Sequence, residues 1–274
     1  MKTFKLSLLA IFVIAAMSSA KIAGIPGTIP QGGCTLPNTS FKAGERVSFS
    51  VAYTAAKLIN VSAGAGSFST TLEKLNGRPV YHVVGEGHTL PSYEWAYKAK
   101  DTYETFMDAE TLLPLKFVRN VNEGGHKKYQ NVSFNRAANT AISNEGVFKV
   151  PACVHDVVSA VFYARNIDFS KLRPNDRIPF NIFLDNEIHP MYVRYLGKEV
   201  ISTKYGKFNA IKFKPLTIQG TIFEGGEQMT VWVTDDDNHV PVRIESPIIV
   251  GKVRIDMTSF ENLRNPMSAL IKKY

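Results

Sequence analysis

The chain of 274 residues has few cysteines, a modest share of charged residues and no excess of glycine or proline, and each of these features excludes a class of protein. Two cysteines exclude a disulfide-dense scaffold, and 19 glycines with 14 prolines exclude a collagen-like repeat. With 20% charged and 45% hydrophobic residues, the chain has enough apolar surface to bury a core, which excludes intrinsic disorder. The length permits one large all-β domain or two domains of ordinary size.

The first twenty residues have the three parts of a secretory signal peptide. Lys2 and Lys5 form a positive start, an apolar stretch runs from Leu6 to Met17, and small residues end at Ala20. A retained membrane anchor is the alternative, but this stretch is shorter than the roughly 20 residues that span a bilayer. We therefore expect cleavage near Ala20 and a periplasmic or secreted protein without a transmembrane anchor. Loss of the two lysines lowers the formal net charge from +8 to +6.

Cys34 and Cys153 are the only two thiols. The residues before Cys34 are Gln31-Gly32-Gly33 rather than an apolar lipidation box, so we do not expect a lipid anchor there. Outside the cytosol a disulfide between the two cysteines would persist. It would close a loop of about 120 residues and contribute at most ~5 kcal/mol. Two buried free thiols remain the alternative.

The hydrophobic pattern after Gly44 is mostly that of β-strands. Apolar residues alternate with small or polar ones from Val47 to Tyr53, which is typical of a half-buried strand. The pairs Asn76-Gly77 and Gly124-Gly125 lie between strand-like runs and predict tight hairpin turns. Further runs are spaced as in an antiparallel barrel or strongly curved open barrel of about twelve strands. These further runs are 94–105, 176–184, 191–195, 208–216, 228–234, 240–246 and 252–260.

One segment near the middle of the chain has helical spacing instead. Apolar residues recur at that spacing between Val154 and Asn166, and Asp156 stands where a carboxylate complements the helix dipole. The pattern predicts one substantial helix packed across the sheet, with Val157, Val161 and Phe162 facing it.

These elements predict one folded domain with flanking segments. We expect a Gly/Pro-rich arm over residues 21–40, a single barrel-like domain over 41–262, and a frayed tail over 263–274. No repeat of fixed period is visible, which argues against a solenoid or propeller.

The sequence contains no metal-binding or catalytic motif. The six histidines form no His-x-x-x-His pair, and His82 and His88 are interpreted as surface residues on one strand face. The acidic run 235–238 lacks the spacing of a calcium loop and is interpreted as a hairpin turn. There is no Gly-x-Ser-x-Gly elbow, and carboxylates such as Asp101 and Glu104 lie in no recognisable motif. We expect neither a metal, nor a cofactor, nor an enzyme.

The distribution of aromatic and basic residues suggests a binding protein. Many aromatic residues fall on strands, and an aromatic-rich barrel can enclose a ligand, although aromatic side chains also simply pack sheets. The candidate ligand-binding residues are Tyr53, Arg165, Trp232 and Arg243, but alternation would equally place Arg243 on the solvent face. The pI of 9.3 fits an anionic envelope component better than nucleic acid, because the basic residues are dispersed.

Three functions are compatible with these features. The first is binding or carrying of an apolar or glycan-bearing envelope component, which predicts a cavity. The second is a structural or assembly factor that acts through a protein partner, which predicts a filled interior and an exposed apolar patch. The third, a hydrolase, requires a cleft with perturbed titratable groups.

Several segments, in this order and spacing, resemble a bacterial exported family known as domain of unknown function 3108. The resemblance implies a secreted, mostly antiparallel and barrel-like protein, similar in fold to periplasmic lipoproteins of group-four capsule assembly. It also supports the Cys34–Cys153 bond and implies no catalytic residues. The matching segments are Phe41-Lys42-Ala43-Gly44-Glu45, Cys153 to Ala160 with Tyr163-Ala164-Arg165, Gly197-Lys198-Glu199, Tyr205 to Ala210, and Val231 to Val242.

Overall fold

The computed structural model describes residues 34–55, 59–217, 225–248 and 251–274. The expected signal peptide, its cleavage point and most of the predicted arm lie outside the described residues.

The described chain forms one sheet of sixteen strands with one α-helix, α1 (Val157–Ala164), and two short 3-10 helices, η1 (Pro91–Tyr93) and η2 (Phe169–Lys171). The strands are β1 (Arg46–Ala55), β2 (Ile59–Leu75), β3 (Arg78–Thr89), β4 (Lys100–Asp108), β5 (Pro114–Glu123), β6 (His126–Asn135), β7 (Thr140–Ser143), β8 (Gly146–Lys149), β9 (Val154–His155), β10 (Arg177–Leu184), β11 (Glu187–Ser202), β12 (Gly206–Pro215), β13 (Thr230–Thr234), β14 (Pro241–Ile248), β15 (Gly251–Glu261) and β16 (Leu270–Lys273).

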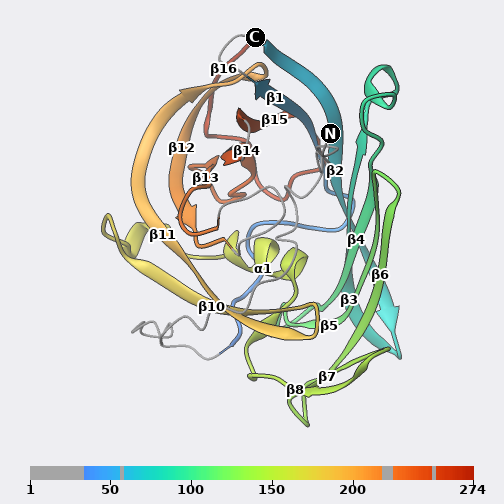
Figure 1. The fold of residues 1–274 in the computed structure, drawn as a ribbon. Helices are drawn as coiled ribbons and strands as arrows, with labels where there is room; N and C mark the ends of the chain where they lie inside the picture. The colour runs from blue at the N-terminus through green and yellow to red at the C-terminus, as the bar shows by residue number, and fades with distance from the viewer. Residues whose placement is uncertain (1–33, 56–58, 218–224, 249–250) are drawn as a thin grey trace.

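The sheet curls around α1 (Figure 1). Its strand order is β8-β7-β6-β5-β4-β3-β2-β1-β15-β14-β13-β12-β11-β10-β9, and β16 pairs with β12. Neighbouring strands are antiparallel, except that β9 runs parallel to β10.

The all-β class predicted from the sequence is therefore confirmed. Within the described chain the order ends at β8 and at β9, so an open curved sheet, rather than a barrel closed by hydrogen bonds, describes the arrangement. The expected count of about twelve strands was too low, because β7, β8, β9 and β16 have at most four residues each.

Two hairpin turns have the backbone conformation that their sequences predict. Asn76 and Gly77 have φ values of 51° and 82°, and Gly124 and Gly125 have 56° and 86°. Positive φ at both central residues matches the twist of the flanking strands. The turn between β10 and β11, at Asp185-Asn186, has the same feature with φ of 54° and 63°. Neither residue of this turn is a glycine, and the sequence pattern did not predict the turn.

Several of the predicted boundaries were wrong. The strand expected over 94–105 begins only at Lys100, because the chain before it turns through η1, where Tyr93 N donates to Leu90 O at 2.8 Å. Residues 263–274 are not a frayed tail, since they include β16 and Asn265, whose backbone N donates to Asn238 Oδ1 at 2.9 Å.

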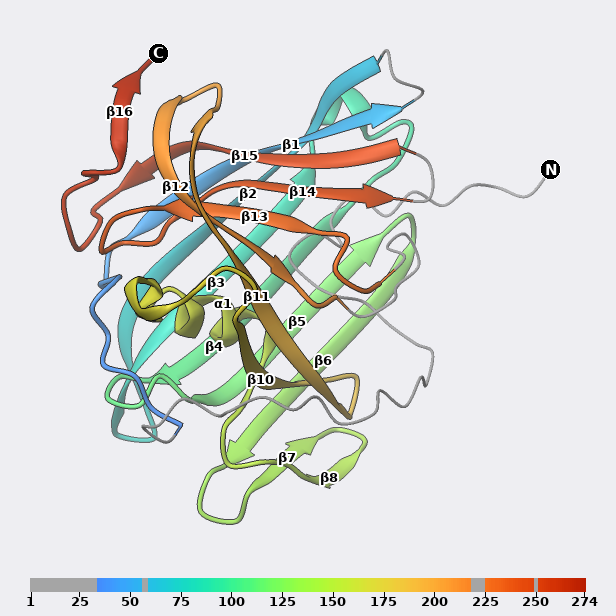
Figure 2. The same ribbon diagram turned by 90° about the vertical axis from the view of Figure 1, so that its left-hand side faces the viewer.

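The helix is shorter than predicted because residues 154–155 form β9 instead. Asp156 caps it as expected: its Oδ1 accepts from Val158 N and Ser159 N, each at 2.8 Å. The Ser159 hydroxyl in turn accepts from Asp156 N at 2.9 Å, which completes a capping box. Val157 and Phe162 are buried, whereas Val161 is only partly buried. Figure 2 shows α1 within the curve of the sheet.

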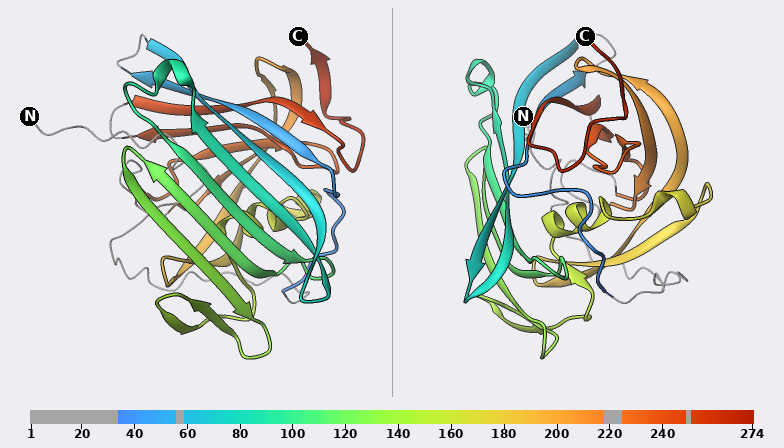
Figure 3. Two further views of the ribbon diagram at one scale, coloured as in Figure 1. Left: turned by 90° about the vertical axis from the view of Figure 1, so that its right-hand side faces the viewer. Right: turned by 180° about the vertical axis from the view of Figure 1, so that it is seen from behind.

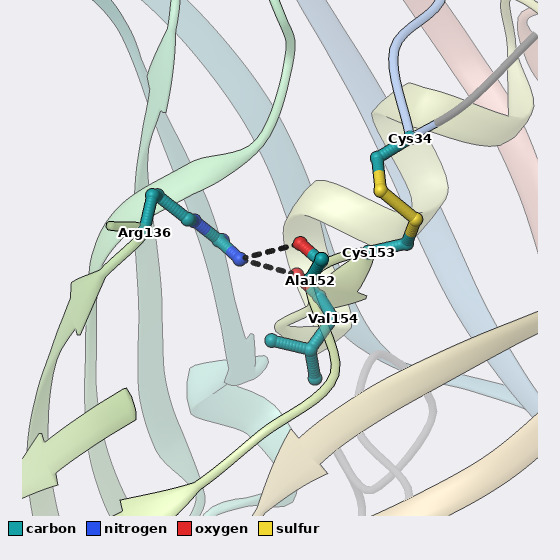
Figure 4. The surroundings of a disulfide bond; sticks show 5 residues. All are labelled: Cys34, Arg136, Ala152, Cys153 and Val154. Atoms are coloured by element: carbon teal, nitrogen blue, oxygen red, sulfur yellow. Dashed lines mark hydrogen bonds between the residues drawn. A yellow bond between two sulfur atoms is a disulfide. The ribbon is translucent and has the colours of Figure 1, made fainter. Parts of the chain in front are cut away.

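The N-terminal segment is attached to both sides of the helix. The disulfide between Cys34 and Cys153, which the sequence left open and the family resemblance supported, is present (Figure 4). Beyond the other end of the helix, Thr39 N donates to Asn166 Oδ1 at 2.7 Å, and the Ser40 hydroxyl donates to Arg165 O at 2.6 Å. Figure 3 shows this blue segment crossing beside α1. The segment therefore fixes the helix against the sheet.

Candidate ligand-binding site

A cavity of about 160 Å³ lies between α1 and the inner face of the sheet. The helix contributes Val157, Ala160, Val161 and Ala164, and strands β1, β2 and β10–β14 contribute aliphatic and aromatic side chains. All of its lining residues are apolar except Arg165, Thr217 and His239.

The register of the strands explains why this face is apolar. Val231 lies opposite Phe213 on one side and Ile244 on the other, so the three side chains project to the same face. Ala160 and Ala164 are one helical turn apart and therefore also share a face. Their side chains are single methyl groups, which leaves volume between the helix and the sheet.

Arg165 is held by a buried ion pair at the edge of this cavity. Its Nη1 and Nη2 donate to Glu45 Oε1 and Oε2 at 2.5 and 3.1 Å, and the side chains of Arg165 and Glu45 are only 4% and 2% exposed. The remaining donors reach two backbone oxygens, Nε to Asn238 O at 3.0 Å and Nη2 to Ser40 O at 3.2 Å. The charge of the guanidinium is thus balanced within the protein.

The other two polar lining residues also bond to the protein. His239 Nδ1 donates to Arg165 O at 2.6 Å, and burial lowers the pKa of this histidine, which favours the neutral ring. The Thr217 hydroxyl donates to Gly226 O at 2.8 Å. Because each of these groups already has a partner, the cavity offers an occupant apolar contact rather than charge.

Of the four residues predicted to bind a ligand, only Arg165 lines the cavity. Tyr53 lies on the inner face of β1, where burial and, secondarily, the nearby Glu123 raise its pKa. Trp232 and Arg243 lie opposite each other on the other face of the sheet. Trp232 Nε1 donates to Glu199 Oε1 at 2.6 Å, and Arg243 Nε donates to Asp256 Oδ1 at 2.6 Å. On that face, Trp232 links β13 to β11 across β12, and Arg243 links β14 to its neighbour β15.

A buried charged cluster on β4–β6 was missed. Arg119 is 1% exposed and pairs with Asp185 of the β10–β11 turn, which also pairs with Lys128. Burial, followed by the nearby Glu123, raises the pKa of Asp101 to about 7. The detectable signal was Arg119 itself, since it has the same strand parity as two apolar neighbours, Phe117 and Val121.

This cluster ties the two halves of the molecule together rather than opening to solvent. Asp185 is contributed by the hairpin that closes over β5 and β6, and Asp101 is only 1% exposed. Asp101 Oδ1 accepts from Asn122 N at 2.8 Å, which fixes it to the neighbouring strand. None of these residues lines the cavity. The arrangement therefore links the β10–β11 turn to β5 and β6 through buried ion pairs.

The histidine and acidic motifs have structural partners. His82 lies between Glu73 and Glu104, with nitrogen–oxygen distances of 3.0 and 2.9 Å. Asp236 lies in the β13–β14 turn, as expected, and accepts hydrogen bonds from Thr234 Oγ1 and Ala269 N at 2.7 and 3.2 Å. In the described part of the chain, no three His, Cys, Asp or Glu side chains are grouped to hold a metal ion. Within the same ranges, no helix has the length and apolarity needed to cross a membrane.

The solved structures with a similar fold include a beta-barrel-like protein of domain of unknown function DUF1849 from Brucella abortus. The similarity has a TM-score of 0.54 at 7% identity and covers 81% of this chain and 99% of the other. A candidate lipoprotein from Parabacteroides distasonis matches with a TM-score of 0.36 at 13% identity over 83% and 99% of the two chains. A candidate exported protein from Bacteroides fragilis, with a YmcC-like fold, matches with a TM-score of 0.32 at 14% identity. That match covers 83% of this chain and 100% of the other.

No curated protein matches the sequence. A family described as "protein of unknown function (DUF3108)" matches residues 48–258, which is most of the chain and confirms the resemblance found in the sequence motifs. The chain therefore belongs to the DUF3108 family.

Proposed function

We propose that this protein is a non-enzymatic binding protein of the bacterial cell envelope that holds the apolar end of an envelope component. The observation that carries the proposal is the cavity beside α1, whose lining is apolar and whose three polar residues are bonded to other parts of the protein. Burial of apolar ligand surface in such a site is favourable, whereas a hydroxyl or carboxylate would lose its water without gaining a partner.

The volume of the cavity limits what enters it. A dry cavity of about 150 Å³ lined by aliphatic and aromatic groups accepts benzene. The cavity here, at about 160 Å³, has room for one aromatic ring or an alkyl segment of about six carbons. A longer lipid would therefore insert only its end, and any glycan part would remain outside.

Two features support a location outside the cytosol. The N-terminal twenty residues have the pattern of a signal peptide. The Cys34–Cys153 disulfide is of a kind that persists in oxidising compartments. We place the protein in the periplasm or the secreted fraction.

Native mass spectrometry of the protein purified gently from its own cells, followed by lipid analysis, tests this proposal. A stoichiometric adduct with an alkyl or aromatic group supports it. A mass without adduct, repeated under mild extraction, contradicts tight carriage and favours the assembly factor.

Matched variants separate filling of the cavity from general overpacking. Ala160→Leu enlarges a side chain that lines the cavity and should abolish the adduct while the protein stays folded. Ala141→Leu enlarges a fully buried side chain elsewhere, on β7, and should lower stability by about 1–3 kcal/mol while leaving the adduct. If Ala160→Leu does not fold, Val161→Phe provides a second filling variant at a partly buried position.

A further inference from the structure

The connection between β3 and β4 carries a tryptophan that the fold does not use. Trp95 is 85% exposed, whereas the other tryptophan, Trp232, is 9% exposed. The connection projects beyond the ends of the strands (Figure 1). An indole ring exposed to water does not stabilise the core. Its exposure therefore indicates a contact with another molecule.

The connection presents this ring in a fixed way. Trp95 Nε1 donates to Ser92 O at 3.1 Å, which orients the indole. Gly124 N, in the β5–β6 turn, donates to Lys98 O at 2.9 Å. The ring of Tyr97 lies so close to Gly124 that a Cβ there would stand 2.8 Å from Tyr97 Cε2. The loop is thus braced against the neighbouring turn.

Exposed basic and aromatic side chains lie on this connection and at the adjacent strand ends. Lys100 and Lys127 are exposed at the starts of β4 and β6, and no ion pair of either is found in the described ranges. Lys98 is exposed and paired with Glu94 at 2.8 Å. Tyr129, 61% exposed, has the same strand parity as Lys127 and so projects to the same face. We call Trp95, Lys98, Lys100, Lys127 and Tyr129 the tip surface.

We propose that the tip surface docks onto a membrane containing anionic phospholipid. Tryptophan and tyrosine rings partition to the boundary between headgroups and hydrocarbon, where one side of the ring is apolar and the other polar. Lysines beside them are attracted by anionic headgroups, with about 1 kcal/mol, or about fivefold in affinity, for each. A protein partner would also cover a tryptophan, but unpaired lysines next to it favour the lipid.

The tip surface lies at the same end of the sheet as one end of the cavity. The register from β3 through β2, β1, β15 and β14 to β13 places the β12–β13 connection at that end. Pro215, Thr217 and Met229, which flank this connection, line the cavity. Docking would bring this end of the cavity toward the lipid, but the docking proposal does not depend on what the cavity holds.

The test uses the chain that cleavage after Ala20 leaves, together with vesicles. Trp232→Phe makes Trp95 the only tryptophan, since the chain has two. With phosphatidylcholine–phosphatidylglycerol vesicles its emission should shift to shorter wavelength, and brominated lipid should quench it. Co-sedimentation of the unaltered chain gives the same answer if Trp232→Phe does not fold.

Variants distinguish the tip surface from bulk charge. Trp95→Ser should abolish sedimentation with these vesicles, and Lys100→Gln with Lys127→Gln should weaken it by about 25-fold. Leu72→Ser is the matched control, because Leu72 is 56% exposed near the β2–β3 turn, at the opposite end of the sheet. Unchanged emission, or equal sedimentation of Trp95→Ser and Leu72→Ser, would overturn the proposal and favour a protein partner.

Discussion

Replacement of Glu45 by glutamine tests how the site is held together. Glu45 is the only carboxylate that contacts Arg165 in the described structure, and both side chains are almost fully buried. Glu45→Gln preserves the shape of the side chain but leaves a buried guanidinium without its counter-charge. The same arginine binds the backbone of Ser40 and Asn238, so the N-terminal segment, α1 and the β13–β14 turn all meet there.

The expected loss is large for a single substitution. Removal of one partner from a buried ion pair costs about 3–5 kcal/mol. For a domain of this size each kcal/mol shifts the melting temperature by about 2–4 °C, which predicts a decrease of about 6–20 °C. Thermal and urea unfolding followed by circular dichroism measure this directly.

A double-mutant cycle checks the cause. The double variant Glu45→Gln with Arg165→Met removes both charges and should lose less stability than the sum of the two single variants. If Glu45→Gln alone loses less than about 1 kcal/mol, the pair is not the buried anchor inferred here.

Three further perturbations have expected outcomes of their own. The folded pKa of Asp101, about 7, lies above its ordinary value of 3.8, so between these pH values the native state retains a proton that the unfolded state loses. The free energy of unfolding therefore falls as pH rises from about 4 to about 7. Asp101→Asn should therefore stabilise the protein by up to about 4 kcal/mol at pH 8 and little at pH 4, and equal melting-temperature shifts at the two pH values would contradict this. Burial lowers the pKa of His155 to about 3, so the unfolded state alone takes up a proton below pH 6.5 and stability falls with acid. His155→Phe keeps a ring against Tyr163 and should reduce the loss between pH 6.5 and pH 4, as measured by urea unfolding at each pH. Cys34→Ser with Cys153→Ser opens a closure of 119 residues and should cost at most about 5 kcal/mol, and an unchanged urea midpoint would show that the N-terminal segment is held by its hydrogen bonds alone.

Local features were predictable from the sequence. The Asn76-Gly77 and Gly124-Gly125 turns depend only on their own residues and their flanking strands, and both formed as expected. Asp156 caps the helix because the capping box lies within four consecutive residues. Alternation also identified the main strands, although it gave no signal for strands as short as β9.

Long-range features were not predictable in this way. Arg165 and Glu45 are 120 residues apart, and Arg119 and Asp185 are 66 apart, so no local pattern pairs them. The cavity exists because Ala160 and Ala164 face the inner side of the sheet. The sequence pattern does not show where the helix lies against the sheet, so it could not predict the cavity. Tyr53, Trp232 and Arg243 were selected by residue type and strand position, which leave the face open, and the strand register assigns the last two to the face away from the cavity.

Calorimetric titration of the chain with benzene tests the cavity most directly. Benzene matches a cavity of about 150 Å³ and makes no hydrogen bond, so it reports apolar space alone. The account predicts one binding site in the unaltered chain and in Ala141→Leu, and none in Ala160→Leu. Absence of binding to the unaltered chain, or equal binding to all three proteins, would contradict the claim that the space beside α1 is a ligand site.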